Sequence, residues 1–378
     1  MIVPVGWRPP YRCSPLTRVT YLIPTLDRSG AEKQLVLLAT GLPRDRFKPE
    51  VIVLTRTGPL EEDLRRADVP VTVLGKRSKF DLRTLGALKR RLAEDPPDIL
   101  HTWLFAANAY GRLAARKTQS FKTVVSERCV DSWKSGWQLW LDRRLIRGTN
   151  ALLANSQSVA DFYSGQGVPK SLITVIPNAV VPPVRPAMTR EQFLANLKLP
   201  PETKLVGVVG RLAKQKRVDD LLWGMQVLRQ ADPTCRMLVI GDGPERSALQ
   251  QHARDVEVSE FVTFLGHRDD AASLVHYLDV FWLGSSFEGM SNSLMEAMAA
   301  GTPVIATDIP PNRELITHGE QGFLANIGDG VAFAQYSVKL FKEPELRDRI
   351  VTAARNRMLA EFSVQRMIER HIALYDSL

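Results

Sequence analysis

Short apolar runs rich in branched side chains alternate along the chain with longer segments whose apolar residues recur at helical spacing. In the first half these runs predict strands at residues 19–23, 50–54, 71–74, 98–103, 122–125, 151–154 and 173–176. In the second half they predict strands at residues 204–209, 236–240, 261–265, 279–283, 303–306 and 322–324. Most intervening segments are long enough for a helix, so the pattern predicts an α/β fold with parallel, doubly wound sheets rather than hairpins.

The alternation pauses at residues 179–190, a proline-rich segment with neither helical nor strand periodicity. Such a segment is typical of an extended, fairly stiff linker. We therefore predict two domains, residues 1–180 and 191–362, that face each other across a cleft. Ligands of doubly wound sheets bind at the carboxyl ends of the strands, so residues that directly follow strands are the first candidates for a functional site.

The overall composition is that of an ordinary folded protein, with 378 residues, 44% hydrophobic and 24% charged. It excludes a disordered chain, a collagen-like repeat and a disulfide scaffold. No apolar run is long enough for a membrane-spanning helix, and residues 1–18 lack the pattern of a signal peptide, so we expect a cytoplasmic location. Cys13, Cys129 and Cys235 are far apart, which favours buried free thiols over a disulfide or a zinc site.

The net charge of +9 is concentrated in the first half of the chain. Residues 1–180 carry 28 Lys and Arg against 16 Asp and Glu, whereas residues 181–378 carry 22 against 25. A basic half attracts nucleic acid, an anionic membrane face or an acidic substrate, and it can also be a solvated surface without a partner. The basic segments are not interleaved with aromatic residues in any recognised nucleic-acid motif, so we expect no nucleic-acid partner.

Several cations crowd the turn that follows the predicted strand 204–209. Gly210-Arg211 is followed closely by Lys214, Lys216 and Arg217, directly before a segment with helical periodicity. Like charges this close repel one another unless solvent or an anion screens them, and a diphosphate would be held here by charge-assisted hydrogen bonds. A solvated loop without a ligand is the alternative.

A second cluster of candidates begins at Glu288, where Glu288-Gly289-Met290-Ser291 leads into a helix predicted at residues 292–300, with Gly301 as its cap. Backbone N–H groups at a helix N-terminus suit an anion, whereas the Glu288 carboxylate is better suited to sugar hydroxyls. Within the helix, Ser293-x-x-Glu296 also matches a capping box, in which the glutamate bonds back to the helix start.

The first domain offers weaker candidates. Gly30 lies between the first strand and the first helix, where it either lets backbone approach a ligand or simply forms a turn. His101 is predicted to end the strand 98–103 and point into the cleft, as a catalyst or as a hydrogen-bonded structural residue. The chain contains no Asp-x-Asp, His-x-x-x-His or Gly-x-Ser-x-Gly, the usual local signatures of metal binding and serine hydrolysis.

Taken together, Gly210-Arg211 with Lys216, and Glu288-x7-Glu296 followed by Ala-Met-Ala-Ala-Gly-Thr-Pro-Val, resemble the retaining glycosyltransferases of family 4, which have the GT-B fold. Further matches to the family are spread over most of the chain, at residues 29–32, 154–156, 175–178, 241–243, 264–266 and 319–322. The resemblance implies two Rossmann-like domains and transfer of a hexose from a nucleotide diphosphate sugar. The acceptor would be lipid-linked or a saccharide, in polysaccharide or glycolipid synthesis, and neither a metal nor another cofactor would be needed.

The resemblance also implies roles for single residues. Arg211 and Lys216 would neutralise the diphosphate, and Glu296 would bind the ribose. The remaining donor contacts would be the backbone near His267 and Arg268 at the base, and Glu288, Gly289, Met290, Ser291 and Asn292 at the sugar and phosphate oxygens. The first domain, with Gly30 and His101, would bind the acceptor, and residues 363–378 would form a helix that packs back on it.

Other readings of the same scaffold stay open. A nucleotide-sugar epimerase, a phosphorylase and a non-catalytic sugar-nucleotide-binding protein would share most of these features. The basic first half favours peripheral attachment to an anionic membrane at its inner face, since each well-placed Lys or Arg contributes about 1 kcal/mol near such a surface. Residues 76–80 or 89–91 are the segments expected to make this contact.

Overall fold

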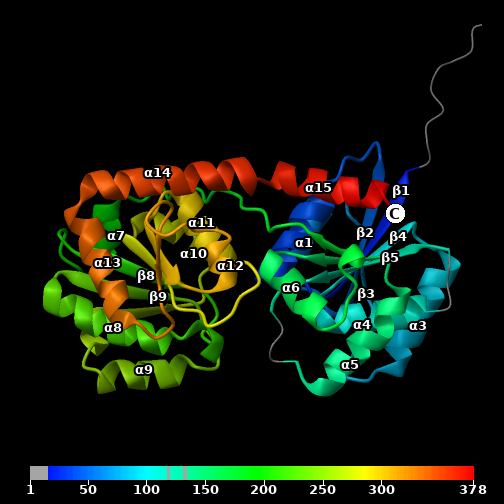
Figure 1. The fold of residues 1–378 in the computed structure, drawn as a ribbon, viewed down its shortest axis with the longest axis horizontal. Coiled ribbons are helices and arrows are strands. Elements are labelled where there is room, and N and C mark those ends of the chain that lie inside the picture. Colours follow the sequence, from blue (N-terminus) through cyan, green and yellow to red (C-terminus); the bar gives the residue numbers. More distant parts are fainter. Residues whose placement is uncertain (1–15, 117–119, 131–133) are drawn as a thin grey trace, which may run out of the picture. The chain divides into compact units, whose positions relative to one another are not determined.

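The computed structural model describes residues 16–116, 120–130 and 134–378 (Figure 1). It contains two sheets, and every strand predicted from the hydrophobic pattern is present. The first sheet has seven strands in the order β3-β2-β1-β4-β5-β6-β7, and the second has six in the order β10-β9-β8-β11-β12-β13. Paired strands run parallel, as in β1 with β2 and β8 with β11. The predicted α/β class with two Rossmann-like sheets is confirmed. Cys13 lies outside the described residues.

The strands of the first sheet are β1 (Thr17–Thr25), β2 (Phe47–Arg56), β3 (Val71–Val73), β4 (Ile99–Trp103), β5 (Lys122–Glu127), β6 (Ala151–Ala154) and β7 (Ile173–Val175). The helices along this part of the chain are α1 (Gly30–Gly41), α2 (Glu61–Arg66), α3 (Leu82–Glu94), α4 (Leu104–Ala115), α5 (Gly136–Leu145) and α6 (Gln157–Gly165), with 3-10 turns η1 (Ile146–Gly148) and η2 (Lys170–Leu172).

The strands of the second sheet are β8 (Lys204–Val209), β9 (Cys235–Ile240), β10 (Val262–Gly266), β11 (Val280–Leu283), β12 (Val304–Thr307) and β13 (Phe323–Ala325). Its helices are α7 (Arg190–Asn196), α8 (Val218–Ala231), α9 (Arg246–Asp255), α10 (Ala271–Leu274), α11 (Asn292–Ala300), α12 (Pro310–Arg313), α13 (Gly330–Lys342), α14 (Pro344–Glu361) and α15 (Val364–Asp376). Three 3-10 turns accompany them: η3 (Lys214–Lys216), η4 (Ser259–Phe261) and η5 (Val275–Tyr277).

By its contacts, the chain divides into two compact units. Unit 1 holds the described residues up to Val125 together with Arg147–Asn150 and Leu378, and unit 2 holds Ser126–Ile146 and Ala151–Ser377. The segment between β7 and α7 contains neither helix nor strand, as the prolines there predict. The domain boundaries drawn at this segment, and the return of the C-terminal helix to the first domain, stay predictions.

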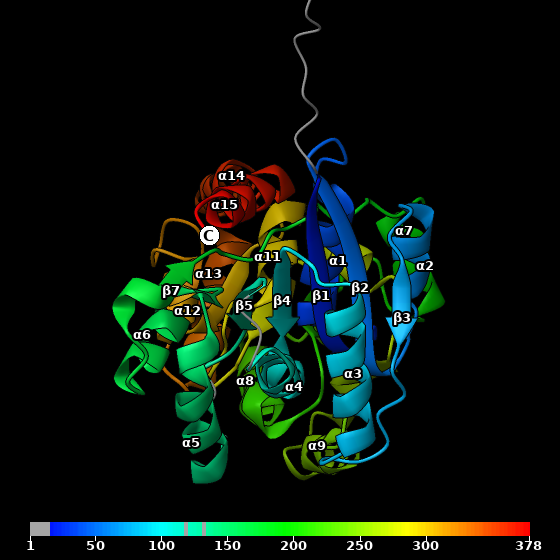
Figure 2. The same cartoon turned by 90° about the vertical axis from the view of Figure 1, so that its right-hand side faces the viewer.

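Within unit 1, strand order and helix packing follow from the alternation of buried residues. Figure 2 shows β4, β1, β2 and β3 side by side in this order. Leu22, Ile52 and Leu100 from neighbouring strands form one apolar cluster with residues of α3 and α4. The helices contribute only the side of each turn that faces the sheet, such as Leu88 and Leu92 of α3, since residues three and four apart share a face.

The second sheet is covered on both faces. Figure 1 shows α8 and α13 beside one another, and both pack on the same face of the sheet, against residues such as Val206 and Trp282. The opposite face packs on α11, through side chains such as Leu294 and Met298. Burial of both faces explains why these strands are nearly continuous apolar runs, the pattern that parallel sheets require.

The carboxyl ends of β8, β9 and β10 each carry a glycine with positive φ: Gly210 (153°), Gly241 (142°) and Gly266 (71°). A Cβ on Gly241 would lie 1.9 Å from the carbonyl oxygen of Gly210, so the loops after β8 and β9 cross with their backbones in direct contact. Only glycine fits this crossing. It packs the loop that carries Arg211 and Lys216 closely against the loop after β9.

Candidate active site

In the cation-rich turn after β8, two of the cations form ion pairs with carboxylates and two do not. The ammonium of Lys216 forms an ion pair with Glu288, and Arg217, in a left-handed conformation with φ of 46°, pairs with Asp220 of α8. Arg211 and Lys214 are exposed, and neither side chain forms a hydrogen bond or ion pair with any described residue. The turn therefore presents two uncompensated positive charges at the carboxyl end of the strand.

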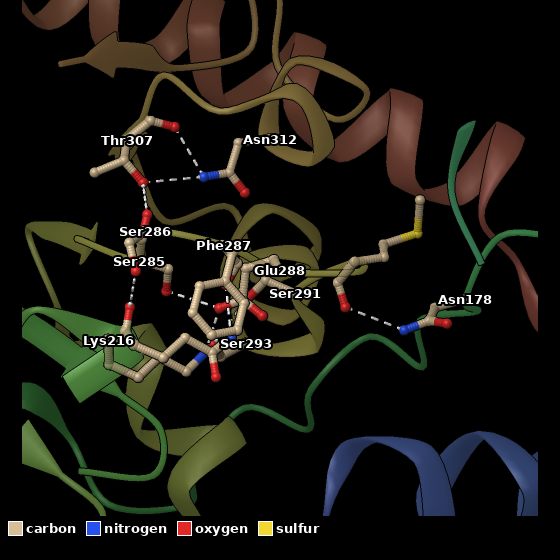
Figure 3. Close-up of polar contacts among 12 residues, drawn as sticks. Asn178, Lys216, Ser285, Ser286, Phe287, Glu288, Ser291, Ser293, Thr307 and Asn312 are labelled. Carbon is tan, nitrogen blue, oxygen red and sulfur yellow. Dashed lines mark hydrogen bonds and ion pairs between the residues drawn. The ribbon is translucent and has the colours of Figure 1, made fainter. Parts of the chain in front are cut away.

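Glu288 lies at the centre of the polar contacts in Figure 3. Its side chain is 10% exposed, and its Oε1 accepts from the Lys216 ammonium at 2.5 Å and from the Ser285 hydroxyl at 2.7 Å. The Ser285 carbonyl in turn accepts from the Thr307 hydroxyl at 2.5 Å, which ties the loop after β11 to the end of β12. Two partners, Lys216 and Ser285, therefore hold the carboxylate in one orientation.

Gln215 joins the two loops directly. Its side-chain amide donates to the Phe287 carbonyl at 2.6 Å, and its own carbonyl accepts from the Ser286 backbone N–H at 2.9 Å. Because β8 and β11 are neighbours in the sheet, the turn after β8 and the loop after β11 leave the same edge side by side. The structure thus brings Arg211, Lys216 and Glu288, far apart in sequence, into one site.

The loop from Gly289 to Asn292 leads from this site into α11 and is held by an asparagine that sequence analysis did not assign to the site. The Asn178 amide donates to the Met290 carbonyl at 3.2 Å and to the Asn292 side chain at 2.7 Å. Asn178 follows β7 and is almost fully buried. The bond to the Asn292 side chain lies beside the N-terminus of α11, so Asn178 fixes where the helix begins.

Two further residues complete this support. Arg128, which follows β5, donates to the Asn178 side-chain oxygen at 2.5 Å, and Asn155, which follows β6, donates to the Arg128 carbonyl at 3.2 Å. A Cβ on Gly289 would lie 2.0 Å from that same carbonyl oxygen, so glycine is required for the two backbones to meet. Asn155 and Asn178 belong to short motifs that match the family, each directly after a strand, whereas Arg128 has no sequence signal of its own.

Burial has the largest effect on the pKa values of the ionisable groups behind the loop Gly289–Asn292. Removal from water lowers the pKa of the Arg128 guanidinium to about 9, since a charge is less stable in a medium that cannot solvate it. Burial also lowers the pKa of His371, on α15, to about 3, and the positive charge of Arg128 acts in the same direction. His371 is therefore neutral at physiological pH, and the positive charge in this buried region is carried by Arg128.

Helix α11 begins at Asn292 and ends at Ala300, the predicted bounds, with Gly301 in a left-handed conformation as its cap. The N-cap is Ser291, so Ser293 is the second residue of the helix and Glu296 the fifth. A capping box joins the N-cap to the third residue, so the capping alternative for Ser293 and Glu296 is wrong. Glu296 is half-buried.

His267 and Arg268 directly follow β10, and both are exposed. Arg268 forms a two-pronged ion pair with Asp270, with distances of 2.8 and 2.7 Å, which raises the pKa of the guanidinium. The loop after the neighbouring strand β9 carries a similar pair between Asp242 and Arg246. These ion pairs stabilise the segments that follow β9 and β10 at the edge of the candidate site.

The two candidates on the first sheet have local environments of their own. Gly30 is the first residue of α1, and the nearby carboxylate of Glu32 accepts from the hydroxyls of Ser29 and Thr25. Burial raises the pKa of Glu32. His101 is the middle residue of β4 and is fully buried beside the rings of Tyr21 and Trp103, so its predicted place at the end of the strand is wrong. The acceptor-side roles of Gly30 and His101 stay predictions.

Residues 16–116, 120–130 and 134–378 hold neither a candidate membrane-spanning helix nor a metal-ligating cluster. None of the helices there combines the length and the apolar character needed to cross a bilayer. In the same ranges, no three His, Cys, Asp or Glu side chains are grouped so as to hold a metal ion.

Two family models match the chain. The model of glycosyl transferases group 1 matches residues 189–357, and the model of glycosyltransferase family 4 matches residues 28–182. Among curated proteins, N-acetyl-alpha-D-glucosaminyl L-malate synthase of Bacillus anthracis is 30% identical over 46% of this chain, a match that spans only 45% of that protein. An Escherichia coli protein, UDP-Gal:alpha-D-GlcNAc-diphosphoundecaprenol alpha-1,3-galactosyltransferase, is 24% identical over 94% of this chain and 95% of its own.

Solved structures agree on the fold. Anabaena HepE, in its complex with UDP-glucose, matches with a TM-score of 0.85 and 22% identity, over 96% of this chain and 100% of that one. The strand orders of both sheets fit the same architecture. The two family models match consecutive stretches that together span most of the sequence, and the fold is the one that the family has. The chain therefore belongs to the GT-B glycosyltransferases of group 1 and family 4.

Proposed function

We propose that the protein is a retaining glycosyltransferase that moves a hexose from a nucleotide diphosphate sugar to a lipid-linked or saccharide acceptor, in polysaccharide or glycolipid synthesis. The observation that carries the proposal is the uncompensated guanidinium of Arg211 beside the Lys216–Glu288 pair, at the carboxyl end of β8. A diphosphate needs such a surplus of positive charge as its bond to the sugar breaks. The names of the E. coli relative and of the UDP-glucose complex support the donor class and the acceptor class.

The two cations contribute differently. Lys216 is already partly neutralised by Glu288, so it supplies a positioned donor with little net charge. Arg211 has no such partner among the described residues, and it supplies the net positive charge. Guanidinium groups bind phosphate oxygens through two parallel hydrogen bonds, which orients the diphosphate as well as stabilising it.

Sugar recognition is assigned to Glu288 and to the loop Gly289–Asn292. The carboxylate accepts from sugar hydroxyls, and the backbone N–H groups before α11 donate to phosphate or sugar oxygens. Asn178 and Arg128 hold this loop in place before any ligand arrives. Donors fixed in advance lose no free energy to reorientation at the moment of reaction.

The acceptor proton needs no separate base in this scheme. In front-face transfer the acceptor attacks from the side on which the diphosphate leaves, and a leaving phosphate oxygen takes the acceptor's proton. We assign no proton transfer to His101, because its ring has no exposed surface. The configuration at the anomeric carbon is then retained.

The donor base and ribose are assigned to the rim after β10 and to α11: His267 and Arg268 border the base, and Glu296 accepts from the ribose hydroxyls. We expect Glu296→Gln to raise the donor KM by about 5- to 30-fold, because losing a charge-assisted bond costs about 1–2 kcal/mol. Steady-state kinetics at saturating acceptor, with melting curves as the control for folding, measure this. A variant with unchanged donor kinetics would refute the ribose assignment.

No divalent ion takes part in the proposed mechanism, since Arg211 and Lys216 supply the positive charge at the leaving group. We therefore expect initial rates to be the same with and without an excess of EDTA, within the error of the assay. Loss of turnover with the chelator, restored by Mg²⁺ or Mn²⁺, would contradict metal independence and leave the family assignment intact.

Thermal-shift measurements with UDP, GDP and ADP sugars, followed by product analysis, test the proposed function. The correct donor at 100 times its Kd should stabilise the protein by about 2.7 kcal/mol. Transfer should then require acceptor, and the product should keep the anomeric configuration of the donor. Conversion of the donor without acceptor would indicate an epimerase, dependence on inorganic phosphate a phosphorylase, and binding without turnover a sugar-nucleotide-binding protein. Each of these results would overturn the proposal.

We also propose that the protein works peripherally at the cytoplasmic face of an anionic membrane. Of the two segments expected to contact lipid, residues 89–91 expose Lys89 and Arg90 on α3, whereas Arg91 is held by Glu50 at 3.0 Å and Asp95 at 3.3 Å. Residues 76–80 end in Phe80, whose side chain is 76% exposed.

A further inference from the structure

Helix α5 carries two tryptophans on one exposed face. Trp137 is 50% exposed and Trp140 59% exposed, three residues apart, and Leu141 and Arg144 continue the same stripe at helical spacing. The guanidinium of Arg144 lies 5.6 Å from the centre of the Trp140 ring. Large apolar side chains gathered on a surface in this way usually mark an interaction site.

The opposite face of α5 is anchored by a buried ionic cluster. Lys134, just before the helix, has no exposed side-chain surface, and its ammonium contacts Asp142 of α5 at 3.0 Å, the Tyr163 hydroxyl of α6 at 2.6 Å and Glu127 of β5 at 3.5 Å. Breaking one partner out of such a buried cluster is strongly unfavourable. The helix is therefore fixed to the ends of its neighbouring strand and helix, and its tryptophan face is presented outward as a rigid surface.

The exposed charges of α5 and the turn that follows it are all positive. Arg143, Arg144 and Arg147 are exposed, and the Arg143 guanidinium also donates to the carbonyl and side-chain oxygens of Gln166. Asp142 is the only acidic residue between positions 134 and 148, and it is buried against Lys134. A surface with three arginines and two tryptophans, and with no exposed carboxylate in that stretch, is complementary to an anionic and partly apolar partner.

We propose that α5 is an interfacial element that inserts Trp137 and Trp140 into an anionic lipid bilayer while Arg144 and Arg147 contact lipid phosphates. Tryptophan prefers the boundary between headgroups and acyl chains, where its ring is buried and its N–H stays hydrated. Arginines flanking an apolar face are typical of helices that lie in this boundary. The inference rests on the proposed function, because it explains how an enzyme with a lipid-linked acceptor reaches it.

The position of α5 in the chain links this surface to the candidate active site. Arg128, whose carbonyl oxygen is in contact range of Gly289, precedes the Lys134 anchor of α5 by six positions in the sequence. A bilayer bound at α5 is therefore close in sequence to a residue that contacts the loop proposed to hold the donor sugar.

Co-flotation with lipid vesicles tests the proposal directly. The full-length protein should bind vesicles of equal parts phosphatidylglycerol and phosphatidylcholine, and bind pure phosphatidylcholine much more weakly. Replacing Trp137 and Trp140 with alanine should weaken binding to the anionic vesicles at least about tenfold, since each buried aromatic ring contributes well over 1 kcal/mol. Replacing Arg144 and Arg147 with alanine should weaken it by at least about tenfold at low salt and much less at 0.5 M salt.

Trp223 provides a matched control, because it is also 50% exposed but belongs to α8, a helix that packs on the second sheet. Trp223→Ala should bind vesicles like the parent protein. Vesicles with brominated acyl chains should quench tryptophan emission in the parent and in Trp223→Phe, but not in the Trp137→Phe/Trp140→Phe variant.

Two results would overturn the proposal: undiminished binding of the double alanine variant, or loss of binding in Lys89→Ala/Arg90→Ala with quenching unaffected by the α5 changes. Transfer to a water-soluble saccharide acceptor separates this inference from the proposed function. The α5 variants should keep this transfer activity. If neither the parent protein nor any variant transfers sugar to the soluble acceptor, the proposed glycosyltransferase function is refuted, independently of the vesicle-binding results.

Discussion

Replacing Arg211 with alanine is expected to lower turnover by about 10²-fold or more, the usual cost of removing one donor to developing negative charge. Lys216 cannot substitute for it, because its ammonium is already engaged by Glu288 at 2.5 Å. Donor affinity should fall less than turnover, since the charge on the diphosphate is greatest as the bond to the sugar breaks. Pre-steady-state or saturating kinetics with the donor identified by thermal shift measure the effect.

Lys214 is the matched control for this experiment. It lies in the same turn, is exposed, and, like Arg211, forms no ion pair with a described residue. If only the net charge of the turn matters, Lys214→Ala should lower turnover as much as Arg211→Ala. We expect less than about a threefold change for Lys214→Ala, because surface charges act weakly unless they are placed against the reacting atoms. An unchanged rate for Arg211→Ala would show that the turn is only a solvated loop.

Replacing Gly289 with alanine is the second change expected to have a large effect, a loss of turnover of about 10²-fold. The added Cβ would lie 2.0 Å from the Arg128 carbonyl oxygen, a contact that backbone cannot relieve without moving the loop. A shift of the order of 1 Å at a positioned group is enough to cost about 10²-fold in rate. The loop carries Glu288 on one side and Asn292 on the other, so both would move.

The control is Gly86→Ala on α3, where a Cβ would meet nothing within 4 Å. That change should leave turnover as it is and slightly raise the melting temperature, because alanine favours a helix by up to about 1 kcal/mol over glycine. If Gly289→Ala instead keeps full activity, the close approach of Gly289 to Arg128 is not needed for the reaction. Melting curves of both variants separate a displaced loop from global unfolding.

The fold was readable from the sequence because parallel sheets buried on both faces leave long apolar runs. Strands such as Lys204–Val209 and the helix Asn292–Ala300 were predicted with the bounds that the structure has. The position of His101 was not, because an apolar run gives the extent of a strand only to within a residue or two. Its last residue, Trp103, is buried and ends the strand in place of the histidine.

The candidate site was predictable in part. Arg211 and Glu288 follow strands and differ in chemistry from their surroundings, so position and residue type both indicate them. Arg128 and Asn178 act through contacts between residues 50 or more positions apart, which no local pattern encodes. The capping box predicted at Ser293 and Glu296 is wrong although the residue types match the motif. The bonds from Asn178 to Met290 and Asn292 fix the start of the helix two residues earlier.

The crossing of Gly210 and Gly241 limits how this protein can change its substrate. Where two backbones meet without room for a Cβ, no substitution is neutral, so this part of the proposed donor site cannot be altered one residue at a time. His267 and Arg268, exposed at the end of the next strand, carry no such restriction. A switch of donor, by selection in the laboratory or in nature, is therefore expected to proceed through positions 267 and 268 while the glycines stay fixed.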